Sequence, residues 1–115
     1  MNRTRLLSVR FFCTATGREP VREWLRGLER ESKKVIGEDT KTVQLGWPIG
    51  MPVVRKLDRD LWEVRSALAN SIARVIFTVH EGTIILLHGF IKKSQLTPKR
   101  DLNLALNRLQ ILQSE

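Results

Sequence analysis

Apolar and polar positions along the chain divide it into segments of two kinds. Apolar residues that alternate with polar ones, or that form short runs, predict strands. These strands cover residues 5–12, 53–57, 61–68, 72–80 and 83–91. Apolar residues at helical spacing predict three helices, which begin near Pro20, at Ser32 and near Pro98. The middle helix, residues 32–45, is the least regular, because Gly37 interrupts it and its apolar positions are sparse.

Short connections join the later strands. Asp58, Arg59 and Asp60 separate one pair of strands, and Glu81 and Gly82 separate another. Such loops are typical of antiparallel hairpins, so the four strands between residues 53 and 91 form a meander. The order of strand, two helices, meander and helix predicts an α+β fold in one domain of residues 1–115. We expect the helices on one face of the sheet and the other face free to carry cations.

Composition adds a strong positive charge to this picture. The 115 residues include 20 Lys and Arg against 12 Asp and Glu, a net charge of +8. Clustered cations on a small domain favour nucleic-acid binding, because bound phosphates release their counterions. A solvated basic surface or an acidic protein partner would give the same composition.

Other classes of protein are disfavoured by what the composition lacks. A single cysteine allows no disulfide within the chain and no metal site built on cysteines. The N-terminal residues are too interrupted by charge for a signal peptide, and no apolar stretch approaches the ~20 residues that a membrane helix needs. We therefore expect a cytoplasmic protein that contacts no membrane and needs no metal or cofactor.

Candidate functional residues lie on the predicted meander. Arg65 and Arg74 belong to neighbouring strands and could converge on one phosphate, since a guanidinium fork matches phosphate oxygens. Glu63 projects from the same face as Arg65. An ion pair of Glu63 with either arginine on a solvated face is the alternative, which the spacing alone slightly favours. Lys92 and Lys93 follow where the last strand ends.

Further candidates are less specific. Lys56, on the first strand of the meander, could join the same cationic patch. Lys99 and Arg100 fall in the first turn of the last helix and fit ordinary surface charges. His88 lies inside an apolar strand, where a histidine is more often a hydrogen-bonded structural residue than a catalyst, although its unperturbed pKa is near neutrality. His80, at a turn, is expected to be exposed.

The remaining unusual residues are expected to be structural. Cys13 fits a small core residue on the first strand. Trp24 and Trp62 fit core positions as well. Trp47, in a loop, could stack on a base, but a tryptophan folded over the core is commoner.

Several segments, taken in series, resemble the phage-derived, HigB-like branch of the RelE/ParE toxin superfamily. They are residues 54–57, 61–65, 73–77, 87–93 and 97–98, and the resemblance runs from about residue 9 to residue 112. Each segment alone is weak, whereas their combination is specific.

This resemblance implies a RelE-like toxin of a bacterial type II toxin–antitoxin pair. Such toxins enter the A site of the small ribosomal subunit, beside its rRNA, and cleave mRNA without a metal. The 2′-hydroxyl attacks the adjacent phosphate, which leaves a cyclic phosphate and a 5′-hydroxyl, and translation stops. The implied partner is a helix-turn-helix antitoxin, and operator DNA is contacted only through it.

The implied chemistry needs a base, an acid and cations around the reacting phosphorus. By the resemblance, Arg65 and Arg74 stabilise transition-state charge, and Lys92 and Lys93 hold phosphates, one of them acting as an acid. His88 is a candidate base or positioning group. Further candidates for base, substrate positioning or RNA contact are Lys56, Glu63, Lys99 and Arg100.

One feature departs from the superfamily. Many relatives use a tyrosine late in the chain, whereas this chain has no tyrosine. The alternative is therefore a basic module that binds RNA or the antitoxin without cutting, or a co-regulator of the operon.

Overall fold

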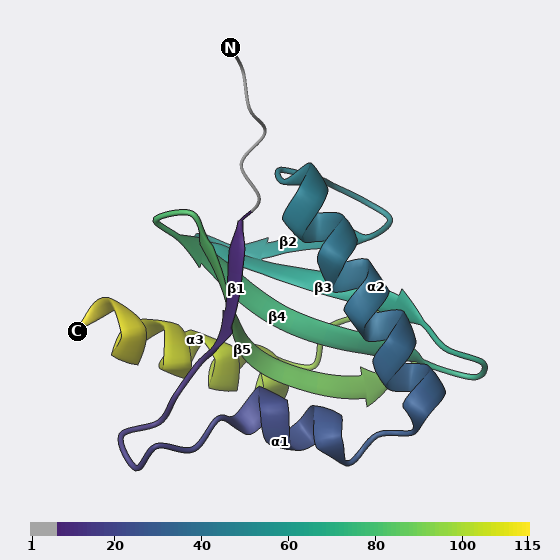
Figure 1. The fold of residues 1–115 in the computed structure, drawn as a ribbon, viewed down its shortest axis with the longest axis horizontal. Coiled ribbons are helices and arrows are strands. Elements are labelled where there is room, and N and C mark those ends of the chain that lie inside the picture. Colours follow the sequence, from purple (N-terminus) through teal and green to yellow (C-terminus); the bar gives the residue numbers. More distant parts are fainter. Residues whose placement is uncertain (1–6) are drawn as a thin grey trace.

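The computed structural model describes residues 7–115 of the chain. Its elements follow one another as β1 (Ser8–Phe11), α1 (Pro20–Arg26), α2 (Arg30–Gly46), β2 (Val54–Asp58), β3 (Leu61–Ala67), β4 (Ile72–His80), β5 (Thr83–Lys92) and α3 (Lys99–Gln113). The strands form one five-stranded sheet in the order β1-β5-β4-β3-β2 (Figure 1). The predicted α+β class is confirmed.

Local sequence explains where several elements begin and turn. Pro20 starts α1, because a proline in the first turn of a helix loses no hydrogen bond. The hairpins turn at Asp60, with a φ of 58°, and at Glu81 and Gly82, with φ values of 48° and 76°. Positive φ at both central residues, as at Glu81 and Gly82, is what a type I′ hairpin turn requires.

Two predicted elements differ in their bounds. α2 begins at Arg30 rather than at Ser32, and it continues through Gly37 to Gly46. The start of the first predicted strand, before residue 7, lies outside the described residues. Within residues 7–115, no helix is long and apolar enough to cross a bilayer.

The sheet is mixed rather than purely antiparallel. Strands β2 to β5 form the predicted antiparallel meander. β1 then pairs in parallel with β5, so that Ser8 lies opposite Thr83 and Phe11 opposite Leu86. The first strand thereby becomes one edge of the sheet and β2 the other.

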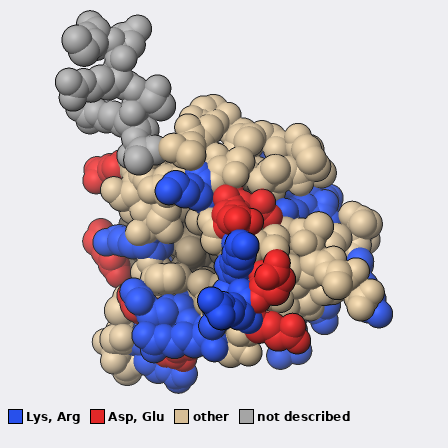
Figure 2. Space-filling view, turned by 45° about the vertical axis from the view of Figure 1, so that its right-hand side comes forward, with Lys and Arg blue, Asp and Glu red and all other residues tan. Residues whose placement is uncertain are grey.

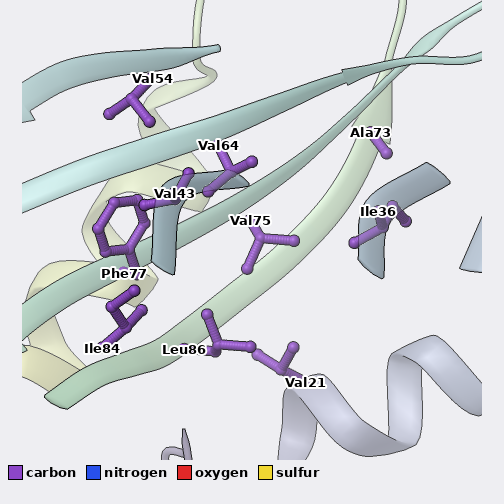
Figure 3. Packing of buried hydrophobic residues seen from close by; sticks show 10 residues of the cluster. All are labelled: Val21, Ile36, Val43, Val54, Val64, Ala73, Val75, Phe77, Ile84 and Leu86. Atoms are coloured by element: carbon purple, nitrogen blue, oxygen red, sulfur yellow. The ribbon is translucent and has the colours of Figure 1, made fainter. Parts of the chain in front are cut away.

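Helices cover both faces of the sheet, so the expectation that they lie on one face is wrong. α1 and α2 pack on what we call the α2 face, where Val21 and Val43 join the apolar cluster drawn in Figure 3. α3 packs on the opposite α3 face, where Ala105 and Leu109 join a second cluster. The reason lies in β5: residues 84–87 are all apolar and all buried, and both faces of the strand therefore need cover.

A β-bulge at Leu87 changes which way β5 presents its side chains. Ile76 of β4 lies opposite His88 while Phe77 lies opposite Leu86, which leaves Leu87 as the extra residue. Leu87 packs in the cluster of the α3 face, and His88 contacts α3 as well. Without the bulge, alternation would turn His88 toward the α2 face together with Leu86.

The tryptophans expected to be structural lie in the core, whereas the cysteine does not. The ring centroid of Trp47 is 5.0 Å from that of Trp62 and 5.5 Å from that of Phe77, so this loop tryptophan is folded over the core. Trp24 packs against the same cluster. Cys13 is exposed and follows the end of β1, so the expectation of a core cysteine is wrong.

Candidate functional site

Three arginines meet on the α3 face of the sheet. Arg65 of β3 lies directly opposite Arg74 of β4, and Glu63 of β3 lies opposite Arg55 of β2. Residues two apart in a strand share a face with each other and with their cross-strand partners. Leu61, two residues before Glu63, packs in the cluster of the α3 face and fixes which face this is. We call Arg55, Arg65 and Arg74 the arginine cluster.

Glu63 lies buried beneath this cluster. Its side chain is 0% exposed, and its Oε1 atom is 3.6 Å from Nε of Arg65. The hydroxyl of Thr97 donates a hydrogen bond of 2.7 Å to its Oε2 atom. The alternative of an ion pair between Glu63 and Arg65 is therefore confirmed, but the pair is buried and does not lie on a solvated face. The side chain of Glu63, like that of Arg74, lies beneath the loop and does not reach the surface.

The loop between β5 and α3, residues 93–98, covers the arginine cluster with its backbone. Arg74 donates a short hydrogen bond from Nη2 to the carbonyl of Ser94. Arg65 donates from Nη2 to the carbonyl of Gln95 at 2.8 Å, and Arg55 donates from Nη1 to the same carbonyl at 3.2 Å. The loop therefore lies where a ligand with oxygen acceptors would otherwise lie.

The cluster holds more positive charge than Glu63 can balance. Arg74 is fully buried, and this burial lowers the pKa of its guanidinium; Glu63 opposes the shift, while Arg65 and Arg55 add to it. Within residues 7–115, its Nε and Nη1 atoms have no hydrogen-bond partner, and neither does Nε of Arg65, which lies 3.6 Å from Oε1 of Glu63. Buried polar groups are nearly always satisfied in stable proteins. Unused cationic donors at one place therefore favour an anionic ligand with several oxygens.

Exposed cations lie on both sides of the covering loop. Lys92 ends β5 and Lys93 begins the loop, and both are exposed. Lys99 and Arg100 open α3 and are exposed as well. The structure thus brings these four predicted residues to the two ends of the loop that covers the arginine cluster.

Lys56 does not belong to this group, which corrects the expectation that it joins the same patch. It lies opposite Trp62 in the pairing of β2 with β3, and its Nζ atom is 5.8 Å from the centroid of the Trp62 ring. Trp62 packs on the α2 face. Arg55 takes the place that the sequence suggested for Lys56. Choosing between adjacent residues needs the strand register, because a slip of one residue exchanges the two faces.

His88 lies beside the arginine cluster. Its Nε2 atom is 2.7 Å from Oδ1 of Asp101 in α3, so the expectation of a hydrogen-bonded histidine is confirmed. Its ring stacks on Phe90, with centroids 5.6 Å apart and planes inclined by 22°. Cζ of Arg74 is 5.9 Å from the centroid of the same Phe90 ring. His80 is exposed, as expected.

Charge is unevenly spread over the surface of the molecule. On the face that Figure 2 presents, Lys and Arg side chains gather in the lower part, with Asp and Glu side chains beside them. A hollow of about 430 Å³ adjoins Arg65 and Gln95, with Met51 and Ile72 among its walls. Within residues 7–115, no group of three or more His, Cys, Asp and Glu side chains could hold a metal ion.

Comparison with known proteins identifies a family for this chain. The model of a family described as phage-derived protein Gp49-like matches residues 23–110, which include every residue of the site described above. This family is RelE-like and is associated with the toxins of toxin–antitoxin pairs. No curated protein matches the chain. The match covers most of the sequence, and the chain therefore belongs to the phage-derived Gp49-like family of toxin-like proteins.

Proposed function

We propose that this chain is a ribosome-dependent mRNA endonuclease of the HigB-like branch, acting in the cytoplasm as the toxin of a toxin–antitoxin pair. The observation that carries the proposal is the arginine cluster, in which Arg74 is buried, three guanidinium groups face one carboxylate, and some N–H donors have no partner within residues 7–115. Cleavage of RNA by its own 2′-hydroxyl builds negative charge on a five-coordinate phosphorus. Fixed guanidinium groups in a buried site stabilise that charge far better than water-exposed ones.

The covering loop has a defined part in this proposal. The carbonyl oxygens of Ser94 and Gln95 accept the hydrogen bonds that phosphate oxygens would accept from the arginine cluster. Binding of mRNA therefore requires this loop to move, and the phosphate then takes over the donors that the loop releases. The exposed cations at its two ends, Lys92 and Lys93 before it and Lys99 and Arg100 in α3, would hold neighbouring phosphates.

The reaction transfers two protons and needs no metal. The 2′-oxygen gives its proton to His88, forms a bond to phosphorus, and the bond from phosphorus to the 5′-oxygen breaks. The 5′-oxygen takes a proton from Lys92 or Lys93, which leaves a cyclic phosphate and a 5′-hydroxyl. We assign the base to His88 because this chain has no tyrosine, the residue that many relatives of the superfamily use late in the chain.

A second candidate function is a binding module without nuclease activity. The absence of tyrosine favours it, as does the cover of backbone over the arginines. Such a module would bind RNA or a helix-turn-helix antitoxin, or would assist that antitoxin on operator DNA. The antitoxin is the protein partner that we propose under either function.

Induced expression in a bacterial host tests the proposal. We expect the wild type to arrest growth and to create new mRNA 5′ ends within coding sequence. Arg74→Met keeps the volume of the buried side chain but removes its charge, and we expect it to abolish both effects. Arg59→Met, in the exposed turn between β2 and β3, is the matched control and should remain toxic.

Each protein must be shown to be soluble and folded by circular dichroism. Folded wild type that leaves growth and mRNA intact would reject the nuclease and support the binding module. A folded Arg74→Met protein that is as toxic as the wild type would reject the role given to the arginine cluster.

A further inference from the structure

We infer that Asp101 is a positioning residue, which fixes the tautomer of His88 and leaves one imidazole nitrogen free to accept a proton. The inference rests on the proposed function and adds to it a residue from α3 that the resemblance does not assign. Asp101 was also absent from the candidates that the sequence suggested.

The contact itself determines which nitrogen carries the proton. Oδ1 of Asp101 lies 2.7 Å from Nε2 of His88. An ionised carboxylate only accepts hydrogen bonds, so Nε2 must donate and therefore bears a hydrogen. In the neutral imidazole, the lone pair then lies on Nδ1. This is the logic by which a buried aspartate orients the histidine of a catalytic triad.

The surroundings of Asp101 and His88 support the contact between the two side chains. Asp101 lies in the first turn of α3, where the unpaired amide groups of the helix stabilise negative charge. The Asp101 side chain is 14% exposed and that of His88 is 15% exposed, so water competes little for the hydrogen bond. Within residues 7–115, Nδ1 of His88 has no hydrogen-bond partner, and it is therefore free to accept a proton.

The pair of His88 and Asp101 and the arginine cluster share one aromatic ring. Phe90 stacks on His88 and also lies below the guanidinium of Arg74. This arrangement links the proton acceptor to Arg74 of the arginine cluster through one aromatic ring. The bulge at Leu87 is what makes it possible, because it turns His88 onto the α3 face.

The charged groups that surround His88 come from three elements. Asp101 and Arg108 belong to α3, and Arg108 donates a 2.7 Å hydrogen bond to the carbonyl of Leu87. Arg74 of β4 lies over the ring of Phe90, which stacks on His88. Glu63 belongs to β3, two strands from His88. Its cross-strand partner, Ile76 of β4, lies opposite His88. Asp101 is the one carboxylate among them that contacts the imidazole.

Asp101 also joins α3 to β5, so a test must separate positioning from anchoring. Asp101→Asn keeps the size of the side chain and can still hydrogen-bond to Nε2, but its amide can donate as well as accept. The amide therefore no longer dictates the tautomer. Asp101→Glu retains the carboxylate, and His80→Gln is the matched control, because His80 is exposed and only 3.7 Å from the exposed Glu81.

Nitrogen NMR of the two imidazole rings gives a readout that does not depend on cleavage. In the wild type at a pH where His88 is neutral, we expect the Nε2–H form alone, whereas His80 exchanges between both forms. In Asp101→Asn we expect His88 to populate both forms. An unchanged tautomer in Asp101→Asn, or a mixture in the wild type, would overturn the inference.

The second readout is the pH–rate profile of mRNA cleavage on the ribosome. We expect His88→Gln to lose at least about 100-fold in rate together with the acidic limb of the profile. Asp101→Asn should lose a similar factor, Asp101→Glu should recover part of it, and His80→Gln should match the wild type. Asp101→Asn with a wild-type rate would reduce Asp101 to an anchor of α3. If the wild type itself does not cleave, the proposed function fails, and the NMR result alone decides whether Asp101 sets the tautomer.

Discussion

Gly89 is the position where one added methyl group would cost most. A Cβ atom there would lie 2.3 Å from Cε3 of the Trp24 ring. Trp24 belongs to α1, which packs on the α2 face of the sheet. We expect Gly89→Ala to lower the free energy of unfolding by about 1–3 kcal/mol through overpacking. Gly37→Ala, inside α2 with nothing within 4 Å, should instead raise it by about 0.5–1 kcal/mol. Urea unfolding measures both, and a Gly89→Ala protein as stable as the wild type would contradict the packing described for Trp24.

Glu63 gives a second prediction at the scale of one residue. Its carboxylate is the buried countercharge for Arg65 and Arg74. Removal of one partner from a buried ion pair leaves uncompensated charge, so we expect Glu63→Gln to cost about 3 kcal/mol. Thermal unfolding would show this loss. Glu23→Gln, which breaks the exposed pair with Arg18, should change the melting temperature little. Equal effects of the two substitutions would show that Glu63 is not a buried countercharge.

The pairing of Arg65 with Arg74 could be predicted from the sequence, because a short hairpin connection nearly fixes which residues face each other. The choice of Arg55 over Lys56 could not, since it depends on a register that shifts by one residue within β2. The partner of His88 was also beyond prediction. The contact with Asp101 exists only because a bulge, which no local signal marks, turns the histidine toward α3.

At the scale of elements, the loop between β5 and α3 is held by side chains that come from the sheet. Thr97 donates its hydroxyl to the buried carboxylate of Glu63. Thr97→Val leaves that acceptor unsatisfied, at a cost of about 1–3 kcal/mol, and should free the loop. Hydrogen exchange should therefore become faster at the amides of residues 93–97. Thr42→Val, which removes a hydroxyl bonded within α2, is the control and should leave this exchange unchanged.

If exchange in the loop were unchanged in Thr97→Val, the arginine hydrogen bonds alone would be holding the loop. The distinction matters for function, because the proposed site becomes available to phosphate only when this loop leaves the arginines.

The placement of helices shows what a hydrophobic pattern leaves open. The bounds of the elements follow from periodicity and turn residues. The bounds predicted for strand β4, residues 72–80, match the structure at both ends. Which face a helix covers depends instead on how much apolar area each face of the sheet presents. The continuous apolar run of residues 84–87 already indicates a strand buried on both faces. That signal, read on its own, would have placed α3 opposite α1 and α2.

At the scale of the whole molecule, we expect RNA binding to depend more on where the lysines lie than on the net charge of +8. Lys92 and Lys93 flank the arginine cluster, whereas Lys33 and Lys34 lie on α2, which packs on the other face. Replacing either pair by glutamine removes the same charge. We expect only the Lys92/Lys93 variant to flatten the salt dependence of RNA binding, by about 1.4 in the logarithmic slope if both contact phosphates. Titrations with RNA at several salt concentrations measure this, and equal slopes for the two variants would mean that RNA does not bind at the arginine cluster.

The parallel pairing of β1 with β5 imposes an order on the folding of a newly made chain. β1, α1 and α2 leave the ribosome first, but the strand against which β1 pairs and α1 packs is made much later. Contacts between such distant segments form slowly, because a long loop must close before they contribute any stability. The carbonyls that cover the arginines follow β5 directly. A nascent chain therefore pairs its edge strand β1 and packs α1 only after β5 has been made, and it completes the covered arginine cluster only after residue 95 has been added.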